Sequence, residues 1–265
     1  APRRRGDRPM GSQEAFLARV RRALQSEPRH APPVAPEPIS SETAEMLRAR
    51  LQEQRQQLVA RLQEELSAVG GKVVRVQSVA EATQYVTQLA LDLDASLIVR
   101  WQSDILDALE IDASLAQAGI DVHLAAPPQT DASEPEIDAK RQAVRERLAR
   151  AEIGLSGVDY AIAETGTLAL SALPGQMRGV SLLPPVHVAV ASSEQIVATL
   201  ADCLALFQAE GPSLPERLSS CVSFITGPSR TGDIELSLTI GVHGPGELHL
   251  VILEGPEGAG YQEGN

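Results

Sequence analysis

Three glycine-containing segments hold the residues of this sequence that are best suited to bind an anion or to do chemistry. They are residues 164–167 (ETGT), 226–235 (TGPSRTGDIE) and 241–246 (GVHGPG). Each directly follows a short apolar run that reads as a β-strand. Glycine lets backbone N–H groups turn toward one point, so all three segments are predicted to line a ligand crevice.

The segment 226–235 is the richest of the three. Arg230 offers a planar guanidinium that matches a carboxylate or a phosphate, and two acidic residues follow that can orient it. The segment has neither the lysine of a Walker loop nor the G-x-G-x-x-G spacing of a dinucleotide site. An anion site and a polar turn before the next element both remain open. The ligand-binding candidates here are Gly227, Ser229, Arg230, Thr231, Gly232, Asp233 and Glu235.

Glu164 and His243 are the candidate catalytic residues. A carboxylate at the end of a strand serves as a nucleophile, as a general base, or as a cap for backbone amides, and the residues alone favour the cap. Histidine is a common acid–base group, which makes His243 a candidate, whereas His187 lies in the apolar run 186–190 and is expected to be a core residue. The remaining ligand-binding candidates are Thr165, Gly166, Thr167 and Arg178, the last either lining the crevice or pairing with Asp159.

Composition excludes several classes of function. The 265 residues carry a net charge of −12, which disfavours binding to nucleic acid or to an anionic membrane. Cys203 and Cys221 are the only cysteines and no Cys/His metal spacing exists, so we expect no metal and no cofactor in this chain. No apolar run approaches the roughly 18 residues of a membrane span, and we predict a cytoplasmic protein.

The elements that must position these residues alternate between helix and strand. Leucines at helical spacing predict one helix of about 25 residues over 41–69, ended by Gly70–Gly71. The alternation predicts an α/β fold with a mostly parallel sheet and flanking helices, and such sheets bind ligands at the carboxyl ends of their strands. Further helices are predicted over 79–91, 112–118, 136–151 and 196–207, and strands over 73–76, 96–99, 121–124, 159–163, 168–170, 186–190, 221–225 and 248–253.

The first 40 residues differ from the remainder. Residues 1–11 have no apolar periodicity, 12–26 predict a short amphipathic helix with a basic polar face, and five prolines follow between 28 and 38. We therefore predict two parts, an N-terminal extension over 1–40 and an α/β domain over 41–265.

Four stretches together closely resemble the lactate utilization protein C (LutC/YkgG) family, also called the LUD domain. They are 159–167 (DYAIAETGT), 174–184 (PGQMRGVSLLP), 224–235 (FITGPSRTGDIE) and 241–245 (GVHGP). The resemblance implies a NagB/RpiA/CoA-transferase-like fold and a part in oxidising L-lactate to pyruvate. It implies a non-redox, accessory or substrate-handling subunit of a lactate dehydrogenase complex, with a small anionic ligand such as lactate and with iron–sulfur clusters in the partner subunits.

Two other classes of function stay open. CoA transferases use the glutamate of a short Glu-Asn-Gly motif, and 164–166 is similar to it, although Thr165 replaces the asparagine. An isomerase-like or regulatory protein would instead use the Arg230 loop to hold a phosphate. Fold relationship alone does not choose between these functions, and no motif fixes the oligomeric state.

Overall fold

The computed structural model describes residues 17, 40–126, 134–209, 221–232 and 238–256. The chain divides into two units, Ala1–Glu37 and Pro38–Asn265. Leu17 is helical, and the remainder of the predicted N-terminal helix and the proline-rich segment lie outside the described residues. The architecture below is that of the second unit.

A six-stranded sheet forms the centre of this unit, and every neighbouring pair in it is parallel. The predicted α/β class with a mainly parallel sheet is therefore confirmed. Strands β4 and β7 are buried along their whole length, as expected for strands covered on both faces. In spatial order the strands are β1 (Lys72–Val76), β12 (Glu247–Leu253), β7 (Val186–Ser192), β4 (Ile153–Ser156), β2 (Leu97–Arg100) and β3 (Asp121–Leu124). Of these, β4 had no counterpart in the sequence prediction.

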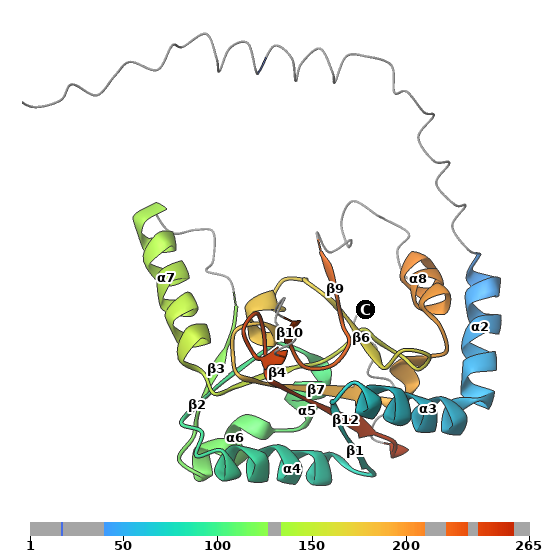
Figure 1. The fold of residues 1–265 in the computed structure, drawn as a ribbon, viewed down its shortest axis with the longest axis horizontal. Helices are drawn as coiled ribbons and strands as arrows, with labels where there is room; N and C mark the ends of the chain where they lie inside the picture. Colours follow the sequence, from blue (N-terminus) through green and yellow to red (C-terminus); the bar gives the residue numbers. More distant parts are fainter. Residues whose placement is uncertain (1–16, 18–39, 127–133, 210–220, 233–237, 257–265) are drawn as a thin grey trace, which may run out of the picture. The chain divides into compact units, whose positions relative to one another are not determined.

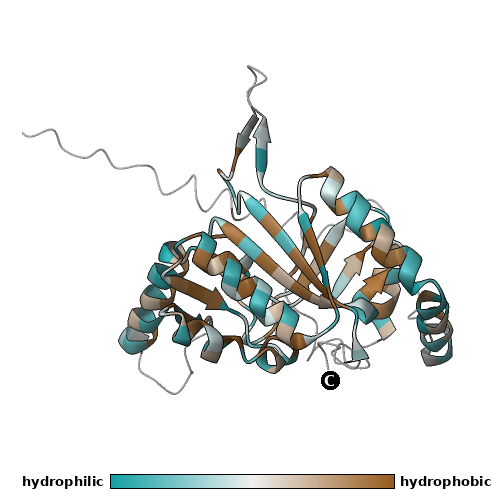
Figure 2. Ribbon diagram, turned by 90° about the horizontal axis from the view of Figure 1, so that it is seen from below, coloured by the Kyte–Doolittle hydropathy of each residue, from teal (hydrophilic) through white to brown (hydrophobic). Residues whose placement is uncertain are grey.

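Helices pack on both faces of the sheet (Figure 1). The helices α4 and α6 lie together on one face, where α4 contacts β1 and β12. On the other face the short 3₁₀ turn η1 (Arg178–Ser181) packs on β4 so closely that a side chain at Gly154 would overlap the backbone of Val180. Figure 2 shows hydrophobic strands between helices that carry hydrophilic residues. The helices are α2 (Ser41–Glu53), α3 (Arg55–Ala68), α4 (Val79–Asp92), α5 (Asp104–Ala108), α6 (Ile111–Gln117), α7 (Glu134–Arg150) and α8 (Leu200–Ala209).

Two helix predictions were wrong in their extent. The single helix expected over 41–69 is two helices, because the backbone leaves helical geometry at Gln54 (φ −95°, ψ 3°). The break lets α2 reach α8, where Arg50 pairs with Asp202 at 2.6 Å, while α3 packs on β1 and β8. The helix expected over 196–207 begins only at Leu200, since the two residues of β8 (Ile196–Val197) precede it. The spacing of leucines in the sequence reveals neither the contact of α2 with α8 nor the strand β8.

A second sheet, whose strands lie between β4 and β12 in the sequence, is mostly antiparallel. It joins β5 to β6 and β6 to β9 in antiparallel pairs, and β5 to β8 in a parallel pair. A hairpin of β10 and β11 extends away from the layers (Figure 2). Buried antiparallel strands show the same apolar runs as parallel ones, so the sequence did not separate the two sheets. The bounds are β5 (Tyr160–Ile162), β6 (Thr167–Ser171), β9 (Val222–Ile225), β10 (Arg230–Gly232) and β11 (Leu238–Ile240).

Candidate functional site

Hydrogen bonds between threonines bring two of the predicted segments together. Thr167 begins β6 and Thr226 follows β9, and because these strands are antiparallel neighbours the two hydroxyls lie 2.6 Å apart. Thr165 extends the chain, its hydroxyl 2.7 Å from that of Thr167. We call these three residues the threonine cluster. Their hydroxyls both donate and accept, so they suit a polar ligand of either character.

Glycines place both turns against the end of α3. Gly166 has a φ of +64°, and a side chain there would overlap the backbone at Leu66. Gly227 has a φ of +81°, and its Cα faces the carbonyl and the side chain of Val69. Positive φ and close backbone approach are what glycine alone tolerates without strain. The conformation and the packing of both turns therefore require the glycines that marked them in the sequence.

The residues after Gly227 lie across the amino ends of β1 and β12. The guanidinium of Arg230 lies against Gly70, two residues before β1. The amide of Ser229 donates to the carbonyl of Pro245 at 2.8 Å, two residues before β12, and Gly244 faces the Ser229 side chain. Two independent contacts thus fix this segment over neighbouring strands of the parallel sheet.

This position contradicts the predicted one. We expected the segments at the carboxyl ends of parallel strands, but 164–167 and 226–232 connect strands outside the parallel sheet, and 241–246 leads into the amino end of β12. The hydrogen bond between Thr167 and Thr226 nevertheless brings the first two segments together. The antiparallel pairing of β5, β6 and β9 produces both results.

Glu164 acts as a helix cap in this structure. It is half-buried, and its Oε1 accepts a hydrogen bond from the backbone amide of Leu200, the first residue of α8, at 2.9 Å. A carboxylate at this point also interacts favourably with the positive end of the helix dipole. This geometry is the cap that the residues alone favoured, and whether Glu164 has a catalytic role stays a prediction.

The other predicted residues are spread more widely. Arg178 is exposed, and its Nη1 lies 3.4 Å from the Cys221 sulfur, at the far end of the β6–β9 pair from the threonine cluster. His243 is exposed on the loop that approaches Ser229. Thr231 and Gly232 continue into β10, whereas Asp233 and Glu235 lie outside the described residues. The fold therefore separates Arg178 from the threonine cluster.

A polar network beside the Arg230 segment was not predicted. Lys72 begins β1 and Glu247 begins β12, and their side chains form an ion pair of 2.6 Å. The same oxygen of Glu247 lies 3.3 Å from Nε2 of His249, whose Nδ1 is 2.7 Å from the Tyr85 hydroxyl on α4. The available signal was Lys72, one of two lysines in the chain, directly after Gly70–Gly71.

The surroundings of this network shift three pKa values. Burial lowers the pKa of His249, which is 2% exposed, and the proximity of Lys72 lowers it further. The hydrogen bond from Lys72, followed by that from His249, lowers the pKa of Glu247. Burial raises the pKa of Tyr85. At neutral pH the network thus contains an ionised Glu247, a neutral His249 and a protonated Tyr85.

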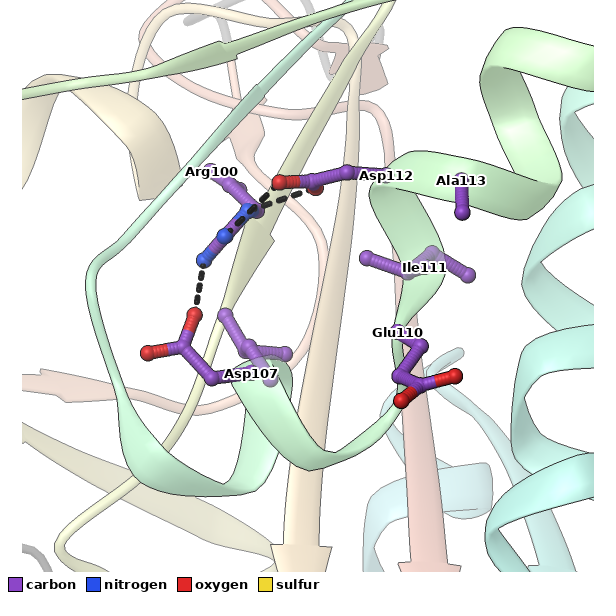
Figure 3. A pocket seen from close by; sticks show the side chains of 7 residues that line it. Arg100, Asp107, Glu110, Ile111, Asp112 and Ala113 are labelled. Atoms are coloured by element: carbon purple, nitrogen blue, oxygen red, sulfur yellow. Dashed lines mark hydrogen bonds and ion pairs between the residues drawn. The ribbon is translucent and has the colours of Figure 1, made fainter.

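A pocket of about 420 Å³ lies at the carboxyl end of β2 (Figure 3). Arg100 forms part of its wall and is held by Asp112 through two hydrogen bonds of 2.7 and 2.9 Å and by Asp107 at 2.8 Å. The Trp101 carbonyl accepts a further bond from the same guanidinium. The guanidinium of Arg100 is therefore already hydrogen-bonded to groups of the protein itself. Among the described residues, no three His, Cys, Asp or Glu side chains group together as metal ligands would.

Comparison with known proteins identifies the family. Residues 59–253 match the LUD domain, so the chain belongs to the LUD domain family. Lactate utilization protein C of Halalkalibacterium halodurans is 38% identical over 109 residues, which cover 41% of this chain and 47% of that protein. Lactate utilization protein B of Shouchella clausii is 25% identical over 232 residues, 73% of this chain and 47% of that protein.

Two further comparisons concern length and fold. The uncharacterized electron transport protein YkgF of Escherichia coli is 27% identical over 231 residues, 73% of this chain and 47% of that protein. The chain thus spans about half the length of the relatives it matches. A DUF162 family protein from Deinococcus radiodurans has the same fold, with a TM-score of 0.51, 22% identity, and coverage of 75% of this chain and 98% of that one. No helix in the described part of the chain has the length and apolarity to cross a membrane.

Proposed function

We propose that this protein takes part in lactate utilization as an accessory or substrate-handling subunit. The observation that carries the proposal is the family membership over 59–253, together with relatives that are named lactate utilization proteins C and B. The names of those relatives imply a system of several proteins. In this proposal the iron–sulfur clusters that accept electrons from lactate belong to partner subunits.

The proposed ligand site joins Arg230 to the threonine cluster. Arg230 is exposed, and within the described residues, which omit 233–237, no carboxylate pairs with its guanidinium. A guanidinium without an internal partner is available to a carboxylate from solution. Thr226 lies on the same segment as Arg230, and Thr165 and Thr167 on the turn bonded to it add further hydroxyls. A small carboxylate such as lactate fits this combination of one cation and neutral polar groups.

A growth experiment tests the cellular role. Deletion of the gene in its native host is expected to abolish growth on L-lactate as sole carbon source, and the wild-type gene is expected to restore it. Arg230→Ala is expected to restore growth poorly. Arg141→Ala is the matched control, because Arg141 is also exposed and its ion pair is with Asp138 on its own helix. Normal growth of the deletion strain on lactate would contradict the proposal.

A binding experiment tests the site separately. Titration of the purified full chain with L-lactate, followed by calorimetry, is expected to show binding that Arg230→Ala weakens by about 10- to 150-fold, the effect of one charge-assisted hydrogen-bonded pair. The fold should survive, because the side chain is exposed. Equal affinity in the wild type and in Arg230→Ala would remove Arg230 from the site.

A further inference from the structure

The ion pair at the start of β1 and β12 lies at the same sheet edge as Arg230. Arg230 contacts Gly70, which precedes Lys72 by two residues. Ser229 bonds to Pro245, which precedes Glu247 by two residues. Since β1 and β12 are neighbours, these two contacts bring the Arg230 segment to the amino ends of the strands that carry the pair. The side chains of Lys72 and Glu247 remain open to solvent, with 58% and 43% of their surfaces exposed.

Both internal bonds of Glu247 go to one of its oxygens. Oε2 accepts from Lys72 Nζ and lies 3.3 Å from His249 Nε2. Within the described part of the chain Oε1 has no partner, so it remains an acceptor for another molecule. Lys72 has three N–H donors and gives one to Glu247. The pair therefore presents a free acceptor and free donors side by side, at an exposed point of the edge.

Such a pair is complementary to an alcohol. A hydroxyl group donates one hydrogen bond and accepts others, so it can give its proton to Glu247 while accepting from Lys72. Arg230 supplies the complementary group for a carboxylate. A molecule with a hydroxyl beside a carboxylate has both features, whereas a plain carboxylic acid has only the second.

We propose that Lys72 and Glu247 form the hydroxyl-recognising half of the ligand site and that Arg230 forms the carboxylate-recognising half. The substrate class is a 2-hydroxy acid, and the ion pair distinguishes it from acids that lack the hydroxyl. This inference rests on the proposed function and adds to it the residues that decide specificity.

His249 and Tyr85 are positioning residues in this arrangement. A carboxylate only accepts hydrogen bonds, so Nε2 of the neutral His249 donates to Glu247 and Nδ1 accepts from the Tyr85 hydroxyl. His249 is 2% exposed and cannot reach a ligand in solution. It occupies Oε2 of Glu247, which leaves Oε1 as the acceptor for a ligand. Tyr85 in turn fixes the imidazole ring.

The test compares two acids that differ by one hydroxyl. Dissociation constants for L-lactate and propionate are measured with the full chain in the wild type, Arg230→Ala, Glu247→Gln and Lys72→Met. The wild type is expected to prefer lactate by about tenfold, the value of one or two solvent-accessible hydrogen bonds. Arg230→Ala should weaken both acids by a similar factor. Glu247→Gln and Lys72→Met should weaken lactate by about tenfold and leave propionate unchanged.

Two further variants test whether the effects are specific to the ion pair and to its positioning residues. Lys140→Met removes the only other lysine, on α7, and should leave both affinities unchanged. Tyr85→Phe keeps the ring but removes the bond to Nδ1, and it should reduce the preference for lactate without changing propionate binding. If the role of Tyr85 were only to fill space, Tyr85→Phe would leave the preference for lactate unchanged. Circular dichroism melting curves confirm that each variant is folded.

The outcomes separate this inference from the proposed function. Equal loss of lactate and propionate affinity in Glu247→Gln and Lys72→Met would overturn the specificity role, as would a wild-type protein that binds the two acids equally. Either result leaves a lactate site at Arg230 intact. A wild type that binds neither acid would instead overturn the ligand named in the proposed function.

Discussion

Two arginines at opposite ends of the parallel sheet show how position decides what a residue can do. Arg100 ends β2, is 11% exposed, and is held by two aspartates and a backbone carbonyl. Arg230 lies across the amino ends of β1 and β12 and is exposed. The first guanidinium holds the loop after β2 through these bonds. No carboxylate among the described residues pairs with the second, which is exposed at the amino end of the sheet.

The two ends are also built differently. At the carboxyl end of β2, the buried Trp101 donates from Nε1 to the Met177 carbonyl at 2.9 Å, and the backbone of Gln102 bonds to Gly175. At the amino end, turns from separate parts of the chain meet through hydroxyls and glycines. Buried, hydrogen-bonded side chains stabilise the first end, and close backbone approach defines the second.

Gly166→Ala should have the largest effect, because it disrupts the packing of the turn 164–167 against the end of α3. The added methyl meets the backbone of Leu66 and cannot be relieved by a side-chain rotation, and the residue also has a positive φ. We expect a loss of about 3–4 kcal/mol in the free energy of unfolding, measured by urea denaturation. Gly119→Ala is the control, since Gly119 has a φ of +79° and open space around its Cα. It should cost only about 1 kcal/mol. Equal losses would show that strain, and not contact with α3, explains Gly166.

Arg100→Met should come second, as a test of the carboxyl end. Loss of the guanidinium leaves Asp107 and Asp112 without their partner, but both are about half exposed and regain water. We expect a loss of about 2–3 kcal/mol, below the cost of breaking a fully buried pair. Arg141→Met removes an arginine whose side chain is 59% exposed and should change stability by less than about 0.5 kcal/mol. If both variants had the same small effect, Arg100 would not be a structural anchor.

A drop in pH should lower the stability of the protein through a buried histidine in the middle of the parallel sheet. His187 in β7 is fully buried, with its Nε2 2.8 Å from the Ser156 hydroxyl, and burial lowers its pKa from 6.5 to about 3. As the pH falls below 6.5, His187 binds a proton in the unfolded chain but not in the folded chain, so the free energy of unfolding decreases as the pH decreases. From pH 7 to pH 5 this amounts to about 2 kcal/mol. His249 contributes in the same direction.

The measurement for this prediction is chemical denaturation at several pH values. His187→Gln removes the titrating group but keeps a polar side chain for Ser156, and it should flatten the pH dependence. His243→Gln changes an exposed histidine and should leave the slope as in the wild type. A wild-type slope in His187→Gln would assign the pH dependence to other groups.

Glu164→Gln should have the smallest effect. The amide can still accept the bond from Leu200 through its oxygen, so only the charge at the start of α8 is lost. We expect a change of about 0.3–1 kcal/mol in stability and no change in lactate-dependent growth. Loss of turnover with unchanged binding would instead support the CoA-transferase-like alternative, in which the carboxylate is the acyl acceptor.

The sequence by itself determined the class of fold, the identity of most elements and the residues worth attention. Apolar runs of strand length alternating with amphipathic segments left few architectures other than a layered α/β unit. The glycines at 166 and 227 marked real turns, because positive φ is a local property that the residue type reveals. The capping role of Glu164 was also foreseeable from its place at a strand end.

Only the tertiary structure decided where these residues lie and what they contact. The pairing direction of β5, β6 and β9 depends on contacts between distant residues, and it moved the expected site from the carboxyl to the amino end of the sheet. The same contacts separated Arg178 from the threonine cluster and joined Lys72 to Glu247, 175 residues away in the sequence. Residue type and spacing carry local conformation, but strand order and direction come from burying all the apolar faces at once. For that reason the chemistry of single residues was readable from the sequence, and their partnership was not.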